Sequence, residues 1–215
     1  MKYRFDGFLP VVIDLETSGC FAGTDAMLEM AAILVNLDSQ GQFQPGEMYA
    51  CHIEPFSGAR LDPKALAVNR IDPGHPFRFA ISEEQALIEL FDFVSPAVTA
   101  SGCRRAILTG HNAHFDLGFL QAAIRRCDLR KKSPFHSFAC LDTATLSGFI
   151  YGKTVLAKAM HAAKLPFNQD EAHSAIYDAQ CTADLFCKML NESKSRFSEW
   201  HRTSLIIPSP SQGEG

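Results

Sequence analysis

The sequence predicts an α/β protein with a mixed five-stranded sheet, in which three antiparallel strands are followed by parallel strands and helices flank the sheet. Two observations lead to this expectation. Three strand-like segments follow one another in the first quarter of the chain, as in an antiparallel meander. Later strand-like segments alternate with helical ones, which favours parallel pairing. A doubly wound nucleotide-binding fold is disfavoured, because no glycine-rich loop follows the first strand.

Five segments have the composition of strands, because they are rich in β-branched and apolar residues and are bounded by turn residues. They are Leu9–Leu15, Glu29–Leu37, Met48–Glu54, Arg105–Thr109 and Phe138–Leu141. Asp38 and Gly41 belong to the turn that joins the second segment to the third.

Helix signals occupy the segments between and after these strands. Asp62 precedes a proline and predicts the N-cap of a short helix that ends near Val68. Ser82, with Gln85 three residues later, is a capping-box signature ahead of an amphipathic helix. Four further helices are expected at about residues 115–127, 143–150, 154–163 and 174–191.

The composition is that of an ordinary globular protein, with 47% apolar and 20% charged residues in a chain of 215. We expect one domain over residues 1–206 and a disordered tail over residues 207–215. The longest apolar run, near Met30–Val35, is far too short to span a membrane. Seven cysteines without a C-x-x-C pair, and no secretory signal, predict reduced thiols in a cytoplasmic protein.

The net charge of −4 conceals an uneven distribution. Seven basic residues lie between Arg104 and Lys132, where only Asp116 and Asp128 oppose them. Such a cluster can be a solvated helix end that complements the helix dipole. It can also be the electrostatic footprint of a polyanion such as a nucleic acid. Charge alone favours the first interpretation.

The first strand ends in two carboxylates that share one face. Asp14 and Glu16 are two residues apart, and alternation along a strand points both side chains in the same direction. Two like charges at the end of a buried strand repel each other and are costly to bury. A cation between them would remove both costs, although a lone pair of this kind more often reaches solvent.

Two further carboxylates lie where later helices begin. Asp116 opens the helix after the fourth strand, at an edge where open α/β sheets tend to place ligands, although the helix dipole alone would also favour it there. Asp178 is expected in the second turn of the last long helix, which apolar strips that include Ile176 should bury on two sides. His173 should lie in the loop that enters this helix. Other acids, expected to be structural, are Asp25, Glu29 and Asp142.

If these segments meet at one end of the sheet, they form an oxygen-rich metal site. Its members would be Asp14, Glu16, Asp116 and Asp178, with His173 beside them. Oxygen ligands suit Mg²⁺ or Mn²⁺, and two such ions can activate a water and stabilise the leaving oxygen of a phosphodiester. A histidine can accept the proton of that water. A zinc site on His111 and His114 is disfavoured, because no third soft ligand has a matching spacing.

Three spaced motifs resemble those of the DEDDh 3′→5′ exonucleases. They are Asp14-x-Glu16, His111-Asn112-x-x-Phe115-Asp116 and His173-x-x-x-x-Asp178. The resemblance implies a ribonuclease H-like fold and two divalent metal ions, Mg²⁺ or Mn²⁺, bound by the four carboxylates. It also implies that Asp14 bridges the ions and that His173 is the general base. The implied reaction releases nucleoside 5′-monophosphates from a 3′ end.

Four further segments, at residues 54–59, 65–73, 100–107 and 134–139, resemble a particular branch of this family. Its members trim the 3′ ends of transfer RNA and other stable RNAs, and they also degrade single-stranded DNA. They work as homodimers, in which a basic patch of one subunit presents RNA to the active site of the other. Arg4, Arg105 and Lys131 match that patch, whereas Asp6 and Thr99 depart from it.

The family also holds the terminal bases between phenylalanine rings. Phe115 and Phe138 match two of these positions, and stacking of this sort tolerates any base. Ordinary core packing competes with this reading, because the chain has 17 phenylalanines. The departures are Cys20 and Val68 at two other stacking positions, with Phe21 beside the first, and Lys64 in place of a glutamate of the base pocket.

Several alternatives remain open from the sequence. Among the enzymes they are a proofreading-type DNA exonuclease, such as a polymerase epsilon-like subunit, and an oligoribonuclease. A catalytically silent nucleic-acid-binding scaffold is disfavoured, because a silent site has no reason to keep buried charge. A small-molecule metal hydrolase would leave the basic and aromatic residues without a role.

Overall fold

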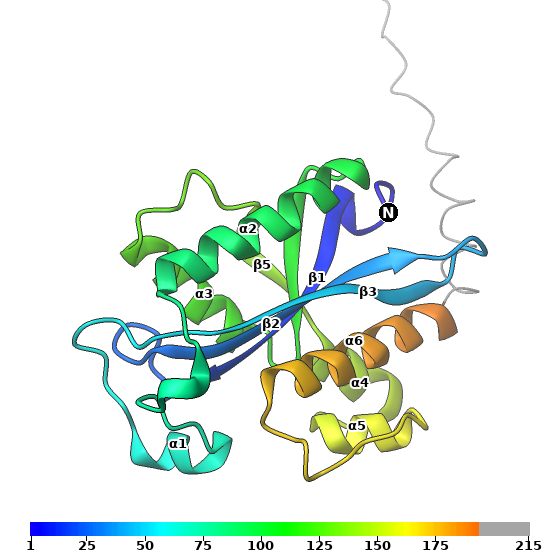
Figure 1. Cartoon of the computed structure of the whole chain (residues 1–215). Helices are drawn as coiled ribbons and strands as arrows, with labels where there is room; N and C mark the ends of the chain where they lie inside the picture. Colours follow the sequence, from blue (N-terminus) through cyan, green and yellow to red (C-terminus); the bar gives the residue numbers. More distant parts are fainter. Residues whose placement is uncertain (194–215) are drawn as a thin grey trace, which may run out of the picture.

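The computed structural model of the chain describes residues 1–193 and contains the expected five-stranded mixed sheet (Figure 1). The strands lie in the order β3-β2-β1-β4-β5. β2 pairs antiparallel with both β1 and β3, whereas β4 pairs parallel with β1 and with β5, which confirms the predicted topology. The strands span Phe8–Thr17 (β1), Met27–Leu37 (β2), Phe43–His52 (β3), Arg105–Gly110 (β4) and Phe135–Asp142 (β5).

Helices cover both faces of this sheet (Figure 1). α2 and α3 bury their apolar residues against one face, and α6 does so against the other. α4 and α5 pack on α6. The helices span Pro63–Asn69 (α1), Glu83–Ala100 (α2), His114–Arg126 (α3), Thr143–Tyr151 (α4), Leu156–Ala162 (α5) and Ala175–Glu192 (α6), with short 3₁₀ turns at Phe5–Gly7 (η1) and Pro76–Arg78 (η2).

The two faces of β1 enter different cores. Ile13 and Leu15 pack with α2 and α3, whereas Val12 packs with α6. Because side chains alternate along a strand, Asp14 and Glu16 lie on the face of Val12. The sheet therefore directs this pair of carboxylates toward the side that α6 covers.

The expected bounds of the third strand are wrong. The strand is Phe43–His52 rather than Met48–Glu54. Pro45 and Gly46, residues that are rare in strands, lie inside it. β3 is an edge strand of the sheet, however, and an edge strand tolerates a proline because its outer N–H groups need no partner.

Three further expectations, one on β5 and two on α6, also differ from the structure. β5 begins at Phe135, three residues before Phe138, because Phe135 already pairs with Ala106 of β4. Ile176 is 51% exposed, so it does not belong to the buried stripe of α6. Asp178 lies in the first turn of α6 rather than the second.

Some expectations fall outside the described residues. The predicted tail at 207–215 and the last part of the predicted domain, 194–206, are among these, so the domain bounds stay a prediction. Among residues 1–193, none of the helices combines the length and the apolar character that a bilayer span requires. The cytoplasmic location also stays a prediction.

Candidate active site

The first two carboxylates lie near the carboxyl end of β1. Across the antiparallel pair with β2, Asp14 faces Ala31 and Glu16 faces Glu29. The register shifts directly after Glu16, so regular pairing ends just beyond the two acids. Both side chains are partly exposed. The strand thus delivers two adjacent acids to an open end of the sheet.

Asp116 reaches the same place from α3. The backbone N–H of Leu15 donates a hydrogen bond of 3.1 Å to its Oδ1, between the two acids of β1. Asp116 is only 5% exposed and lies in the first turn of α3. Gly110 allows the close approach of β4 to β1, because a Cβ there would lie 3.2 Å from the carbonyl oxygen of Ile13. This close approach of β4 to β1 brings the start of α3, the next helix along the chain, to the acids of β1.

Asp178 approaches from α6. Its Oδ2 accepts a hydrogen bond of 3.0 Å from the backbone N–H of His173, a residue in the left-handed region with φ of 69°. Its Oδ1 is buried and has no hydrogen-bond partner among the described residues. Leaving a buried charged oxygen unpaired costs at least roughly 1–3 kcal/mol. This oxygen is therefore placed to bind a group that the protein itself does not supply.

The three elements bring all the predicted chemical residues together. Glu16, His173 and Asp178 each offer one ligand atom, and these atoms all lie within 4.8 Å of one another. Asp116, Asp178 and Glu16 are close enough to Asp14 to raise its pKa, and Glu16 is close enough to Asp116 to do the same. The cluster thus contains four carboxylates, while the histidine ring lies exposed at its edge.

Burial raises the pKa of every carboxyl in the cluster, and repulsion from neighbouring acids adds to this effect at Asp14, Glu16 and Asp116. Removal of water around Asp14 raises its pKa well above the ordinary value, and the neighbouring acids raise it further. Burial raises the pKa of Glu16 to about 7, with Asp178 and Glu29 adding to the effect. Burial also raises the pKa of Asp116 to about 8, against the opposing effect of its backbone hydrogen bonds. The pKa of Asp178 is raised as well, chiefly by burial.

These shifts show that the protein alone does not stabilise four ionised carboxylates at neutral pH. Divalent cations would compensate the charge, and a purely oxygen-donating set suits hard ions such as Mg²⁺ or Mn²⁺. The unpaired Oδ1 of Asp178 is an acceptor already in place for such an ion. The residues present therefore fit the metal ions that the sequence motifs imply.

The alternative zinc pair is not available. His111 uses both ring nitrogens in hydrogen bonds, Nδ1 with Thr143 Oγ1 at 2.9 Å and Nε2 with the carbonyl oxygen of Thr154 at 2.8 Å. Asp142 is structural, as expected, since it caps α4 and accepts a hydrogen bond of 2.8 Å from the Asn112 N–H. His111 therefore anchors the turn before α3 instead of binding a metal.

Two residues, Glu29 and Asn69, lie closer to the cluster than the sequence alone indicates. Glu29, expected to be structural, lies opposite Glu16, and its Oε1 is 3.1 Å from Nδ1 of His52. Asn69 is buried at the end of α1, donates a hydrogen bond of 3.0 Å to the Thr17 carbonyl and also hydrogen-bonds Glu16. The register of β1 and β2 could have revealed Glu29. Asn69 belongs to the segment 65–73 that resembles the family, but its contact with β1 depends on the packing of α1, which the sequence does not show.

The predicted stacking residues differ in exposure. Phe138 is 86% exposed on β5 and is free to contact a ligand. Phe115 is partly buried, and its ring centroid lies 4.9 Å from that of Phe119, a core residue. Core packing and ligand stacking are therefore compatible for Phe115, because only part of the ring is covered.

Phe21 lies 65% exposed in the loop after β1. The guanidinium of Arg60 lies over its ring at 5.2 Å and makes a 2.8 Å ion pair with the buried Asp25, which agrees with the structural role expected for that acid. Val68 and Lys64 both point out of α1 into solvent. The loop after β1 thus presents one exposed aromatic ring, Phe21, while α1 presents the aliphatic Val68 and the cation Lys64.

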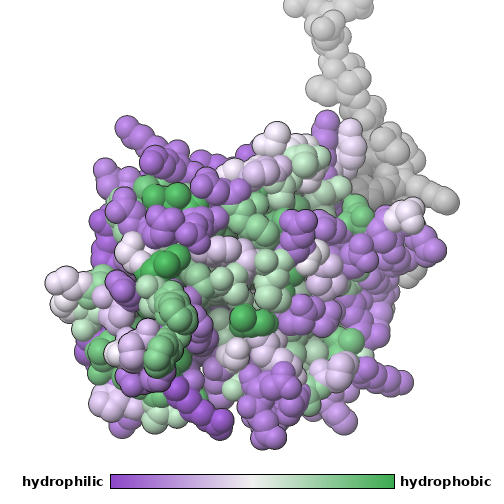
Figure 2. Space-filling view, viewed as in Figure 1, coloured by the Kyte–Doolittle hydropathy of each residue, from purple (hydrophilic) through white to green (hydrophobic). Residues whose placement is uncertain are grey.

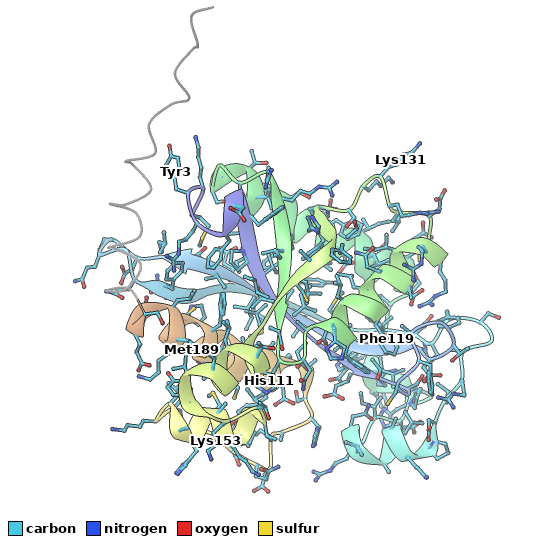
Figure 3. All side chains as sticks on the ribbon, turned by 180° about the vertical axis from the view of Figure 1, so that it is seen from behind. Tyr3, His111, Phe119, Lys131, Lys153 and Met189 are labelled. Atoms are coloured by element: carbon cyan, nitrogen blue, oxygen red, sulfur yellow. The ribbon has the colours of Figure 1, made fainter. Side chains whose placement is uncertain are left out.

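The predicted basic residues lie at the opposite end of the sheet. Arg4 precedes η1, Arg105 pairs with Phe8 at the start of β1 and β4, and Lys131 lies in the loop between α3 and β5. In Figure 3, Tyr3 and Lys131 mark this end, and His111 lies toward the other. These cations are too remote to touch a group bound at the acids of the same chain.

The fold is shared with a class of nucleic-acid exonucleases. Escherichia coli exonuclease I, solved with a dT13 oligonucleotide, superposes with a TM-score of 0.68 over 94% of this chain and 47% of its own length, at 17% identity. A zinc-bound form of its complex with single-stranded DNA gives 0.67. The chain thus spans about half of that enzyme and has its ribonuclease H-like fold.

The sequence comparisons define the family. The RNase_T exonuclease model matches residues 11–186. Ribonuclease T of Shewanella baltica OS155 is 53% identical over 91% of this chain and 87% of its own length, and that of Shewanella oneidensis is 52% identical over the same shares. The chain therefore belongs to the ribonuclease T family and is a metal-dependent 3′→5′ exonuclease acting on nucleic acid. The alternatives of a silent scaffold and a small-molecule hydrolase fall away.

Proposed function

We propose that Asp14, Glu16, Asp116 and Asp178 hold two divalent metal ions, Mg²⁺ or Mn²⁺, and that His173 acts as general base. The observation that carries this proposal is the buried, unpaired Oδ1 of Asp178 in a cluster of carboxylates with raised pKa values. When bound, the ions would supply electrostatic stabilisation of the charge that develops on the phosphodiester and help to activate the water.

The proton transfer would be carried out by a residue of the chain itself. His173 is exposed at the edge of the cluster, where its ring can accept a proton from the attacking water. The water oxygen then bonds to phosphorus as the bond to the 3′ oxygen of the preceding nucleotide breaks. The 3′ oxygen takes up a proton from solvent, so the products are a nucleoside 5′-monophosphate and a strand shortened by one nucleotide with a 3′-hydroxyl.

We expect the substrates to be the 3′ ends of transfer RNA and other structured RNAs, together with single-stranded DNA. Phe138 and Phe115 would stack the terminal bases, and Phe21 would stand in for the ring absent at Cys20. Base stacking on aromatic rings contributes roughly 1–3 kcal/mol per base and accepts all four bases. The exposed Lys64 would add a positive charge where the family resemblance implies a glutamate of the base pocket.

We also propose a homodimer in which Arg4, Arg105 and Lys131 of one subunit guide RNA to the acids of the other. Its support is the separation of the cations from the acids within one chain. Mixing inactive Asp14→Asn subunits with an Arg105→Ala, Lys131→Ala variant should restore activity above that of either variant alone. No restoration after subunit exchange, with mixed dimers verified by mass, would contradict this arrangement.

A 5′-labelled RNA with a short 3′ extension tests the catalytic proposal. With Mg²⁺, the label should appear in a ladder that shortens one nucleotide at a time, and the released product should be nucleoside 5′-monophosphate. Chelator or Asp14→Asn should stop the reaction. Cleavage that continues in Asp14→Asn would refute the role assigned to the four acids.

A further inference from the structure

Two adjoining hollows open on the side of His173 that faces β2 and β3. One has a volume of about 520 Å³ and the other about 320 Å³, sizes within the range of about 300–1,000 Å³ usual for small-molecule sites. Both are lined by Asn69, Arg70, His173 and Ser174. In Figure 1 the segment after α1 and the start of α6 face each other there. Both hollows thus reach the edge of the acid cluster at His173.

Arg70 is placed in this opening at a conformational cost. It is the C-cap of α1, with a left-handed φ of 58°, a position that favours glycine. Its side chain is exposed and makes no ion pair or hydrogen bond with any described residue. A cation at a helix C-terminus gains a little from the helix dipole, but the left-handed backbone of Arg70 costs more than it would cost glycine.

The other charges around the smaller hollow are largely engaged. Glu29 pairs with His52 at 3.1 Å, and Asp72 Oδ1 accepts the Gly74 N–H at 3.0 Å. Arg78 donates to the Leu28 carbonyl at 2.7 Å, which uses its guanidinium to brace the loop. In the larger hollow, Asp170 and Glu171 are the acids. Arg70 is shared by both hollows and is the cation best placed to take an anion.

An aromatic surface lies at the rim of the smaller hollow. Phe77 and Phe79 are 74% and 83% exposed, and the ring of Phe77 lies 5.8 Å from that of His75, which lines the hollow. Because Arg78 between them is tied to the backbone of β2, the two rings are held out rather than folded in. Figure 2 shows hydrophobic side chains gathered on this face at the lower left. A base stacks well on such rings.

We propose that this opening is a second nucleotide site, in which Arg70 binds the phosphate of a nucleoside 5′-monophosphate and His75 and Phe77 stack its base. It rests on the proposed function, because the monophosphate released beside His173 is the natural occupant. The site lies on the β2 and β3 side of the sheet, whereas Phe115 and Phe138 lie on the β4 and β5 side. The product can therefore leave without displacing the strand.

Direct binding of adenosine 5′-monophosphate to the full chain in chelator tests this site without the metal-dependent reaction. Arg70→Gly should weaken binding by about tenfold, because a charge-assisted hydrogen bond is lost while glycine suits the helix end. Phe77→Ala should weaken it by about fivefold through lost stacking. Lys164→Gly is the matched control, since it also removes an exposed cation from a left-handed position and should change nothing.

Three outcomes would overturn the proposal: no binding, equal binding by all three variants, or equal weakening by Lys164→Gly. Inorganic phosphate tests the contact with Arg70, and adenosine tests the stacking on His75 and Phe77. If phosphate binds as tightly as the nucleotide, the proposed stacking is refuted. Asp14→Asn should keep the binding and lose the hydrolysis. Loss of nucleotide binding in Arg70→Gly alongside full hydrolysis in Asp14→Asn would support this site while refuting the catalytic one.

Discussion

The two ends of β1 carry charges of opposite sign. The acids at one end are crowded and largely buried, whereas the cations at the other end are exposed. At its carboxyl end, the acids are crowded, partly or fully buried and fixed by backbone contacts such as that of the Leu15 N–H with Asp116. At its amino end, Arg105 and Lys131 are exposed, and neither makes an ion pair among residues 1–193. Exposed charge costs the fold little, whereas buried like charge is retained only where something compensates it.

This difference predicts what each end can do. The acidic end can hold ions in a fixed geometry, so single substitutions there should have large effects. The basic end can only attract and orient a polyanion, so each substitution there should have a small effect that depends on salt.

Asp14→Asn should have the largest effect, and in opposite directions on activity and stability. Activity with Mg²⁺ should fall by at least about 10³-fold, because a metal ligand that serves the transition state contributes several kcal/mol. The metal-free protein should become more stable, since the variant removes a carboxyl that its neighbours repel. Exonuclease rates and thermal unfolding in chelator measure the two effects. A variant with unchanged activity would contradict the contrast between the two ends.

His173→Ala should come next, with a loss of about 10²–10⁴-fold in rate, the usual contribution of a general base. Metal affinity should stay nearly unchanged, because the four carboxylates remain. Titration with Mn²⁺ followed by paramagnetic resonance provides the comparison. A matched loss of metal affinity would make His173 a ligand, which its position within 4.8 Å of Glu16 and Asp178 would permit.

Stability of the metal-free protein should fall as pH rises from about 4 to about 8. Glu16 and Asp116 keep their protons to about pH 7 and 8 in the folded state, whereas the unfolded chain releases them near pH 4. The folded state therefore binds more protons in this window, and its advantage is lost as pH increases, by at least about 2 kcal/mol. Urea unfolding in chelator measures this loss. Added Mg²⁺ should reverse it, and a metal-free protein that gains stability over the window would contradict these pKa shifts.

Arg105→Ala should have the smallest effect. Binding of RNA should weaken only a few-fold, and the slope of log affinity against log salt should decrease by about one. The single-nucleotide rate at saturating substrate should not change. Lys153→Ala, which removes an exposed cation near the other end of the sheet, is the control (Figure 3). A large loss of rate in Arg105→Ala would mean that the basic end takes part in the chemistry.

Much of this organisation could be predicted from local patterns. The alternation of β1 gave Asp14 and Glu16 a common face, and capping signals located the starts of α1 and α2. The remainder depends on pairing between distant segments. The roles of Glu29 and Asn69 follow from strand register and from the packing of α1, and the early start of β3 follows from its place at the edge of the sheet. No local pattern encodes these relations.

The central claim is that the acidic end of β1 binds two divalent ions. The most direct measurement is the number of Mn²⁺ ions bound per chain at equilibrium, by calorimetry or paramagnetic resonance, in the unmodified protein and in Asp14→Asn. We expect two ions in the former and at least one fewer in the latter. Two ions bound equally well by both proteins, or none bound by either, would contradict it.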